Sequence, residues 1–193
     1  MTPSTPKLKL ATVWLGGCSG CHMSFLDLDE WLFELAQQVE LVYSPFADVK
    51  LYPEGVDVVL VEGAIANQDH LAMIRRVRDR TKFLISFGDC AVTGNVSALR
   101  NPLAQSGAKP AQSSVDAVLN RAYLETATTH AQLPQSDLIP VLLEQVLPVH
   151  QVVAVDCYLP GCPPNAARIR GVLAPLLRGE IPELIGPEYI RFG

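Results

Sequence analysis

The chain has 193 residues, which is enough for one domain built around a single hydrophobic core. Apolar residues make up 49% of the sequence and charged residues 18%, so we expect either a well-filled core or, as we favour, an apolar face buried by a partner subunit. The net charge of −5 argues against binding to nucleic acid or anionic lipid, and no apolar run is long enough to span a membrane. These properties favour a cytoplasmic protein.

The first part of the chain alternates between two kinds of apolar pattern. Continuous β-branched runs predict buried strands, and apolar residues three or four positions apart predict helices. We expect strands at residues 7–15, 39–43, 57–61 and 82–87, one helical stretch with apolar residues between 25 and 35, and a helix at 67–80.

The second part of the chain is less regular. Residues 94–137 are rich in proline, glycine and polar residues, and they predict a long irregular connection with one helix near 115–125. We then expect a short helix at 138–147, a fifth strand at 151–155 and a helix at 165–177. The tail, residues 182–193, carries proline and aromatic residues and is expected to pack on a partner.

Alternating strands and helices predict an α/β fold, a doubly wound parallel sheet with helices on both faces, in a single domain over residues 1–193. In such sheets, ligand sites lie beyond the carboxyl ends of the strands. Cys18 and Cys21 follow the first predicted strand, Cys90 follows the fourth, and Cys162 follows the fifth. The topology therefore predicts that thiols from three separate loops meet at one edge of the sheet.

Four converging thiolates fit a [4Fe–4S] cluster, which needs one thiolate for each iron. The spacing of Cys18 and Cys21 lets one turn direct both sulfurs to the same side, and the neighbouring glycines permit close backbone approach. A four-cysteine zinc site is less favoured, because such sites usually use two CxxC pairs and this chain has one. A thioredoxin-like dithiol would leave Cys90 and Cys162 unexplained.

Several neighbouring residues have two interpretations. Cys157 is interpreted as a buried apolar thiol in preference to a ligand. His22 is either a proton relay or, as we favour, a surface residue at the start of a helix. Glu62 ends the third predicted strand at the same edge as the cysteines, and its carboxylate is either a proton-handling group or a loop cap. Pro163 and Pro164 are expected in the first turn of the last long helix.

Four ordered motifs carry a family resemblance. They are Cys18-Ser19-Gly20-Cys21 followed by Ser24-Phe25-Leu26, Val61-Glu62-Gly63, Gly88-Asp89-Cys90-Ala91, and Pro160-Gly161-Cys162-Pro163-Pro164. Together they resemble the small subunit of [NiFe] hydrogenases and the related cluster-bearing subunit of respiratory NADH dehydrogenase, over about residues 8–177. The CxxC spacing is the hydrogenase form, because the first two ligands are adjacent cysteines in the respiratory relative.

The resemblance implies a flavodoxin-like domain in which Cys18, Cys21, Cys90 and Cys162 bind one proximal [4Fe–4S] cluster. It also implies that Glu62 lies close to this cluster, near the interface with the large subunit. The nickel–iron site belongs to the large subunit in this family. The chain is therefore expected to be the electron-transfer subunit of a hydrogenase and not to be catalytic alone.

Departures from the family pattern indicate which complex to expect. Membrane-bound and periplasmic small subunits carry a twin-arginine signal and two further clusters, whereas this sequence shows no twin arginine at its start and no cysteine after Cys162. The loop after Cys90 reads Gly94-Asn95 where the family usually has paired glycines. The short form is similar to the small subunit of cytoplasmic NAD-reducing hydrogenases, whose diaphorase subunits carry further Fe–S clusters, FMN and the NAD site.

Two alternative functions stay open at this point. One is the small subunit of another cytoplasmic [NiFe] hydrogenase, linked to NADP, sulfur or another carrier. The other is a flavin-binding flavodoxin-like module, which the topology allows. The loop after the first predicted strand argues against flavin, because it offers cysteines where a flavodoxin would offer serine or threonine donors to the phosphate.

Overall fold

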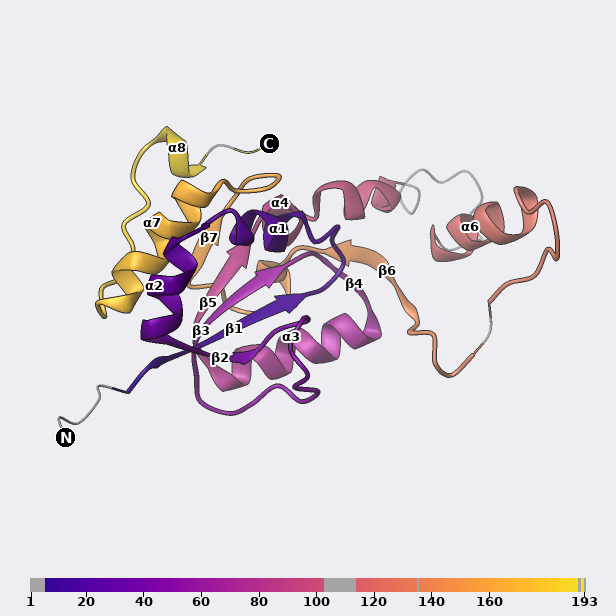
Figure 1. Ribbon diagram of the computed structural model, residues 1–193. Coiled ribbons are helices and arrows are strands. Elements are labelled where there is room, and N and C mark those ends of the chain that lie inside the picture. The colour runs from indigo at the N-terminus through magenta and orange to yellow at the C-terminus, as the bar shows by residue number, and fades with distance from the viewer. Residues whose placement is uncertain (1–5, 103–113, 135, 191, 193) are drawn as a thin grey trace.

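The structure is a computed structural model that describes residues 6–102, 114–134, 136–190 and 192 (Figure 1). Its centre is a five-stranded sheet in the order β2-β1-β3-β5-β7, and every pair of neighbouring strands is parallel. Counted within the sheet, this is the flavodoxin order 2-1-3-4-5. The predicted α/β fold with a parallel sheet is confirmed. The strands are β1 (Leu8–Trp14), β2 (Val39–Tyr43), β3 (Val56–Glu62), β5 (Thr81–Phe87) and β7 (Cys157–Leu159).

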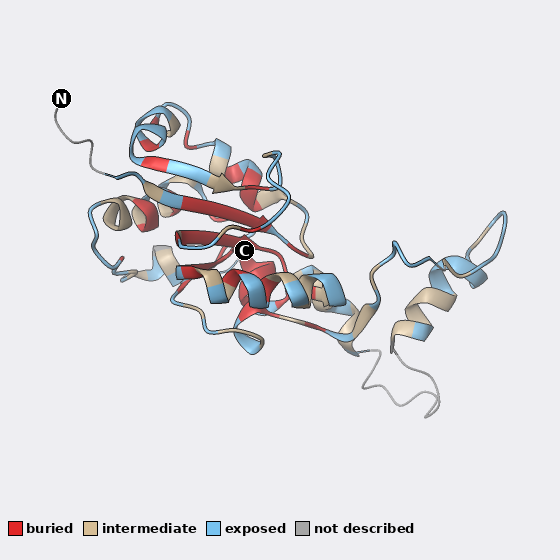
Figure 2. Ribbon diagram, turned by 90° about the horizontal axis from the view of Figure 1, so that it is seen from below, coloured by how far each residue is buried: buried red, intermediate tan, exposed pale blue. Residues whose placement is uncertain are grey.

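The three central strands are buried on both faces, which explains their nearly continuous apolar sequences. Figure 2 shows these strands as the main buried band of the molecule. Successive side chains point to opposite faces, so Leu10 and Val58 belong to one apolar cluster while Ala11 and Val59 belong to the other. The sheet therefore has a separate core on each side.

Helices cover both faces of the sheet (Figure 1). One core contains buried residues of α2 and α7, such as Leu35 and Ile169, and the other contains Ile74 and Val77 of α3. Apolar burial of this kind contributes about 25 cal/mol for each Å² removed from water. The helices on the first face are α1 (Gly20–Leu26), α2 (Trp31–Gln38) and α7 (Ala166–Leu177), and those on the second are α3 (Gln68–Arg80) and the short α4 (Asp89–Thr93).

The helical stretch predicted around residues 25–35 is two helices, so this prediction was wrong in its continuity. Helix α1 ends at Leu26 and α2 begins at Trp31, with Asp29 in the left-handed backbone region at a φ of 49°. The apolar spacing continues across the break because Leu28 and Trp31 both enter the same core. The apolar spacing thus predicted correctly which residues are buried, but it did not reveal the break between the two helices.

The helix predicted at 138–147 is also wrong. This segment contains β6 (Leu142–Leu147), which pairs in antiparallel fashion with β4 (Ile65–Asn67). The pairing satisfies backbone groups of both segments, and Gln68 N–H extends it by donating to the Val141 carbonyl over 2.9 Å. Pairing with β4, which is distant in the sequence, therefore outweighs the local preference of this segment for a helix.

The fifth strand lies later than predicted. Residues 149–151 form the 3₁₀ turn η3 (Val149–Gln151), and the last strand of the sheet is β7, not residues 151–155. The carboxylate of Asp156 accepts from Leu84 N–H over 2.7 Å, and Asp156 N–H donates to the Leu84 carbonyl over 3.0 Å. Sheet pairing therefore starts at Asp156, while Val152 and Val153 pack as side chains on the second core.

In the part of the long connection that the structure describes, residues 94–102, 114–134 and 136–137, short helical turns alternate with irregular segments, and residues 103–113 and 135 lie outside the described residues. The connection begins with the 3₁₀ turn η1 (Asn95–Arg100) and includes α6 (Ser114–Asn120) followed by the π-helical turn η2 (Arg121–Glu125), which confirms the helix expected near 115–125. Figure 1 shows α6 well away from the sheet. The tail contains the short helix α8 (Pro187–Ile190), and its contact with a partner stays a prediction, as does the single domain over 1–193. Among the described residues, no helix has the length and apolarity to cross a membrane.

Candidate functional site

The four predicted cysteine ligands lie in three loop regions at the carboxyl edge of the sheet. Cys18 and Cys21 follow β1 and lie at the start of α1, Cys90 lies in α4 directly after β5, and Cys162 follows β7. Because β1, β5 and β7 belong to one parallel sheet, their carboxyl ends share an edge. The four cysteines therefore lie at one edge of the sheet, as the topology predicts.

Backbone contacts join the loop of Cys90 to the loop of Cys162. Gly88 N–H donates to the Leu159 carbonyl over 2.8 Å, and Asp89 N–H donates to the Gly161 carbonyl over 2.9 Å. The buried Asp89 carboxylate accepts from Gly161 N–H over 2.6 Å in return. These bonds fix two cysteine-bearing loops relative to each other. Asp89 belongs to one of the four motifs, but its contact with Gly161 is not visible in the sequence.

Cys21 lies against the same joined loops. A Cβ atom at Gly88 would lie 2.2 Å from Cys21 Sγ, which is far inside contact distance, and Gly88 has a φ of +83° that disfavours any other residue. In the first loop, a Cβ at Gly20 would lie 3.2 Å from Cys18 Sγ. Glycines thus line the space into which the sulfurs point.

The thiols also affect one another electrostatically. Burial raises the pKa of the Cys21 thiol, and the charges of Glu62, Cys90, Cys18 and Cys162 raise it further. Burial likewise raises the pKa of Cys90, with Cys162 and Cys18 adding to the effect. Such thiols stay protonated unless a cation compensates their charge, and bound iron supplies that compensation. The donor set and the glycine-lined space therefore fit an Fe–S cluster.

A single metal ion fits this arrangement less well. Among the described residues, no group of three or more histidine, cysteine, aspartate or glutamate side chains is placed to hold one ion. A tetrahedral zinc site would draw all its sulfurs to about 2.3 Å from one centre. A cubane spreads four thiolate ligands over four irons, so it does not require the four sulfurs to meet at one point.

Glu62 and His22 form a buried pair beside these thiols. The Glu62 carboxylate accepts from His22 N–H over 3.0 Å and also contacts Nδ1 of the His22 ring. Both side chains are buried, so the surface position favoured for His22 was wrong. Glu62 caps the amino-terminal turn of α1, where a negative charge is favourable, as the loop-cap interpretation expects. Proton handling by Glu62 stays a prediction.

His22 has a further feature that the sequence did not reveal. Its Nε2 is buried and has no hydrogen-bond partner among the described residues. The ring lies edge-on to Phe46 and Phe87, at centroid distances of 5.7 and 6.5 Å. The ring is therefore held by apolar packing on one side and by the Glu62 carboxylate on the other.

Cys157 and the two prolines lie outside the thiol group. Cys157 is buried in the core at the start of β7, and burial raises its pKa to about 11, in agreement with its interpretation as an apolar thiol. Pro163 and Pro164 precede the helix: Asn165 caps α7, and its side chain accepts from Arg168 N–H. The expectation that the prolines form the first helical turn was therefore wrong.

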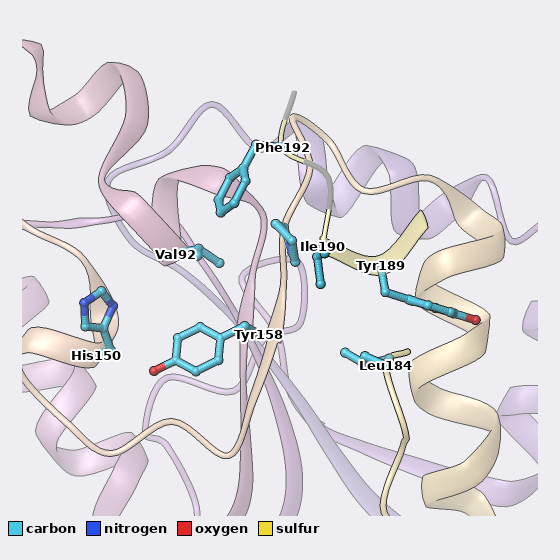
Figure 3. Close-up of a pocket in the computed structure, with 8 residues that line it drawn as sticks. Val92, His150, Tyr158, Leu184, Tyr189, Ile190 and Phe192 are labelled. Carbon is cyan, nitrogen blue, oxygen red and sulfur yellow. The ribbon is translucent and has the colours of Figure 1, made fainter. Parts of the chain in front are cut away.

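An apolar cavity of about 410 Å³ lies beside the last cysteine loop (Figure 3). Side chains of the tail form one side of it, and Val92 of α4, His150 of η3 and residues of and directly after β7 form the other. Tyr189 also packs on α7, where its hydroxyl would lie 2.7 Å from a Cβ at Gly171. The cavity is lined by Val92, His150, Tyr158, Pro160, Leu184, Tyr189, Ile190 and Phe192.

With the site described, comparison with known proteins identifies the family. The model of the family described as "NADH ubiquinone oxidoreductase, 20 Kd subunit" matches residues 18–176. The chain belongs to this family. The matched range contains all four candidate ligands and Glu62.

Subunits of two hydrogenases are similar to this chain in sequence. The chain is 37% identical over 177 residues to the NAD-reducing hydrogenase HoxS subunit delta of Cupriavidus necator, covering 90% of this chain and 80% of that protein. It is 38% identical over 181 residues to a subunit of the F420-non-reducing hydrogenase vhu of Methanocaldococcus jannaschii, covering 93% of this chain and 59% of that protein. The chain thus spans little more than half the length of the methanogen relative. The resemblance predicted from the motifs is confirmed.

Solved structures give the same result for the fold. The chain superposes on a chain of the NAD⁺-reducing [NiFe]-hydrogenase in the H₂-reduced state with a TM-score of 0.87 and 35% identity, covering 97% of this chain and all of that one. It superposes on a chain of the [NiFeSe]-hydrogenase of Dm. baculatum with a TM-score of 0.59 and 16% identity, covering 96% of this chain and 69% of that one. The second likeness shows the fold alone.

Proposed function

We propose that this chain is the electron-transfer small subunit of a cytoplasmic NAD-reducing [NiFe] hydrogenase. It would carry electrons through one proximal [4Fe–4S] cluster held by Cys18, Cys21, Cys90 and Cys162. The observation that carries the proposal is that these cysteines, from three loop regions, lie at one edge of the sheet, and that the charges of the other three act on Cys21. The similarity in sequence to the delta subunit of the NAD-reducing enzyme, and in structure to a chain of such an enzyme, supports the choice of complex.

In this proposal, the protein determines where the cluster lies and how far its ligands are shielded from water. When bound, the cluster supplies a site that gains and loses one electron at a time. Cys21 and Cys90 are buried, so their sulfurs are shielded from water, whereas Cys18 and Cys162 are exposed in this chain. The exposed pair places two ligands where other subunits could approach closely enough for electron transfer.

The proposed partners are a large subunit with the nickel–iron site and diaphorase subunits that carry Fe–S clusters and FMN. Exposed apolar side chains beside the candidate site support this assignment. Trp14, at the end of β1, is 43% exposed, Met23 in α1 is 59% exposed, and Phe46, which packs on His22, is 70% exposed. Apolar side chains next to a buried polar site are typical of an interface core.

Glu62 is proposed to handle protons beside the cluster. Its carboxylate is buried and already bonded to His22, which places a second titratable ring next to it. Exchange of Glu62 for glutamine would keep the size of the side chain and an acceptor for His22 N–H while removing the carboxylate. We expect slower hydrogen turnover with unchanged iron content. Unchanged turnover by Glu62→Gln would exclude this role.

A second candidate keeps the same site in a different complex. The 38% identity to the F420-non-reducing hydrogenase subunit of a methanogen favours a small subunit linked to another electron carrier. The composition of the native complex, determined by mass spectrometry, distinguishes the two. Copurification with NAD-binding and FMN-binding subunits supports the first, and their absence from an active complex supports the second.

The cluster itself is tested by iron analysis and spectroscopy of the purified complex. We expect that Cys90→Ser and Cys162→Ser each lose most of about four irons per copy of this chain, with loss of a broad visible absorption that dithionite bleaches. Cys157→Ser is the matched control and should keep its iron. Full iron retention in the Cys90 and Cys162 variants would refute the ligand assignment, and resolved yellow bands would indicate flavin.

A further inference from the structure

Asn95 makes a direct contact with one of the candidate ligands. Its side-chain amide donates to Cys162 Sγ over 3.5 Å, although the two residues lie 67 positions apart in the chain. This distance is within the range of hydrogen bonds to sulfur, which are longer than those to oxygen. The contact links η1 at the start of the long connection to the loop that follows β7.

The backbone around Asn95 is built to hold that side chain in place. Gly94 and Asn95 both lie in the left-handed region, with φ values of 87° and 37°. Gly94 N–H donates to the Cys90 carbonyl over 2.9 Å, and Asn95 N–H donates to Thr93 Oγ1 over 3.3 Å. Thr93 Oγ1 in turn donates to the Asp89 carbonyl over 2.9 Å. The turn that carries Asn95 is thus tied to the loop of Cys90.

The identity of the residue at position 95 matters. A left-handed backbone is unfavourable for most residues other than glycine, although asparagine tolerates it better than most. Glycine would adopt the same backbone without this cost. What asparagine adds at position 95 is the amide group, and the structure directs that amide to the sulfur of Cys162.

Hydrogen bonds to the sulfurs of an Fe–S cluster raise its reduction potential. Reduction adds negative charge, part of which resides on the thiolate sulfurs, and a donated N–H stabilises that charge. A donor to a ligand sulfur therefore favours the reduced state. The rise in potential is smaller when water competes for the sulfur, and it is larger where a partner subunit excludes water from the hydrogen bond.

We propose that Asn95 is a positioning residue that raises the reduction potential of the cluster by donating a hydrogen bond to Cys162 Sγ. This inference rests on the proposed function, because it requires the four thiols to hold the cluster. Ser97, in the same turn, has a side-chain hydrogen bond with Cys90, but its hydroxyl proton is donated to the Gly16 carbonyl over 2.7 Å, so it is the weaker donor to a ligand sulfur.

The test compares midpoint potentials in the purified native complex. The EPR signal of this cluster is identified as the one that Cys90→Ser removes, and its intensity is followed in a redox titration. Asn95→Gly keeps the backbone and removes the donor, so we expect the reduced state to be disfavoured about tenfold, which lowers a one-electron potential by about 59 mV. Asn95→Asp removes the donor and adds a negative charge, so its potential should fall further.

His130→Gly is the matched control. His130 is an exposed residue with a φ of 49°, so this exchange also places glycine at a left-handed position. Its potential should equal that of the unmodified complex. An unchanged potential in Asn95→Gly, or loss of its iron, would overturn the inference, the latter because Asn95 would then hold the ligand loop and not set the potential. Absence of the signal from the unmodified complex would instead refute the proposed function.

Discussion

Among single residues, a few positions are critical for the candidate site, because the presence or absence of one atom there decides whether the cysteine loops can pack together. Gly88 is the clearest of these, because the space that its missing Cβ leaves is occupied by Cys21 Sγ. Asp89 and Glu62 are buried carboxylates that each accept a backbone N–H from a neighbouring loop. None of these residues is a proposed cluster ligand. Their contacts hold the loops that carry the proposed ligands.

Gly88→Ala is expected to remove most of the iron. The new Cβ would lie 2.2 Å from Cys21 Sγ, and alanine at a φ of +83° adds backbone strain. Iron content and the cluster absorption measure the effect. Gly55→Ala is the control, because Gly55 has a φ of +69° but no atom within 4 Å of the added Cβ. It should lower the free energy of unfolding by about 1 kcal/mol and keep the iron. Equal iron in both variants would show that the contact with Cys21 is unimportant.

Asp89→Ala is expected to loosen the last ligand loop. Gly161 N–H would lose its acceptor in a buried position, which costs about 1–3 kcal/mol in the free energy of unfolding. Because Gly161 precedes Cys162, the iron should also become easier to remove with a chelator. Chemical denaturation and the rate of iron release measure the two effects. If both stay at the values of the unmodified complex, Asp89 does not position the loop.

At the element scale, long-range contacts decide where strands begin. The apolar run at 151–155 has the composition of a strand, yet the sheet pairs with β7 instead. Asp156 sets this boundary through its bonds to Leu84 and through an ion pair with Arg78, whose Nη1 lies 2.5 Å from Asp156 Oδ2. Likewise, Leu142–Leu147 becomes a strand because β4 offers it a partner. Neither contact is visible in the local sequence.

Asp156→Ala should therefore lower stability more than the loss of an ordinary surface charge. It removes the acceptor of Leu84 N–H and the partner of Arg78, and we expect a loss of about 1–3 kcal/mol in the free energy of unfolding. Asp48→Ala breaks an exposed ion pair with Lys50 and should change stability by less than about 0.5 kcal/mol. Urea unfolding of both variants gives the comparison. Equal effects would mean that the bonds of Asp156 do not stabilise the end of the sheet.

At the scale of the whole molecule, the carboxyl edge of the sheet combines a buried polar site with an apolar surface. The excess of apolar residues in the composition is thus placed partly in two cores and partly in exposed side chains such as Met23 and Phe46. The opposite edge also has exposed apolar residues, including Ile181 beyond the end of α7, but no cysteine ligand lies near them in the chain.

Phe46→Asp should weaken the association of this chain with its large subunit. Phe46 is 70% exposed and packs on His22, so a charge there would be buried in the proposed interface. We expect at least a tenfold loss of affinity, measured by the recovery of the large subunit in copurification and by titration. Ile181→Asp changes a residue that is 78% exposed and lies beyond the carboxyl end of α7, whose amino end follows the Cys162 loop, and it should leave the affinity unchanged. Equal binding by both variants would remove this face from the interface.

The amino-acid sequence alone was enough to predict the parallel sheet, the position of most strands and the edge of the sheet at which the four cysteines lie. Residues 39–43 form a strand with the predicted bounds, and Cys18, Cys90 and Cys162 follow strand ends as expected. These features were predictable because strand burial and parallel topology follow from the period and composition of local segments.

The contacts between the loops at that edge could not be predicted, because they join segments that are distant in the sequence. The bonds of Asp89 to the last ligand loop, the burial of His22 against Glu62 and the reach of Asn95 to Cys162 each join residues at least 40 positions apart. The strand at Leu142–Leu147 likewise depends on a distant partner. A local sequence pattern predicts which side of a helix or strand is buried. Which distant segment packs against that side depends on the fold of the whole chain.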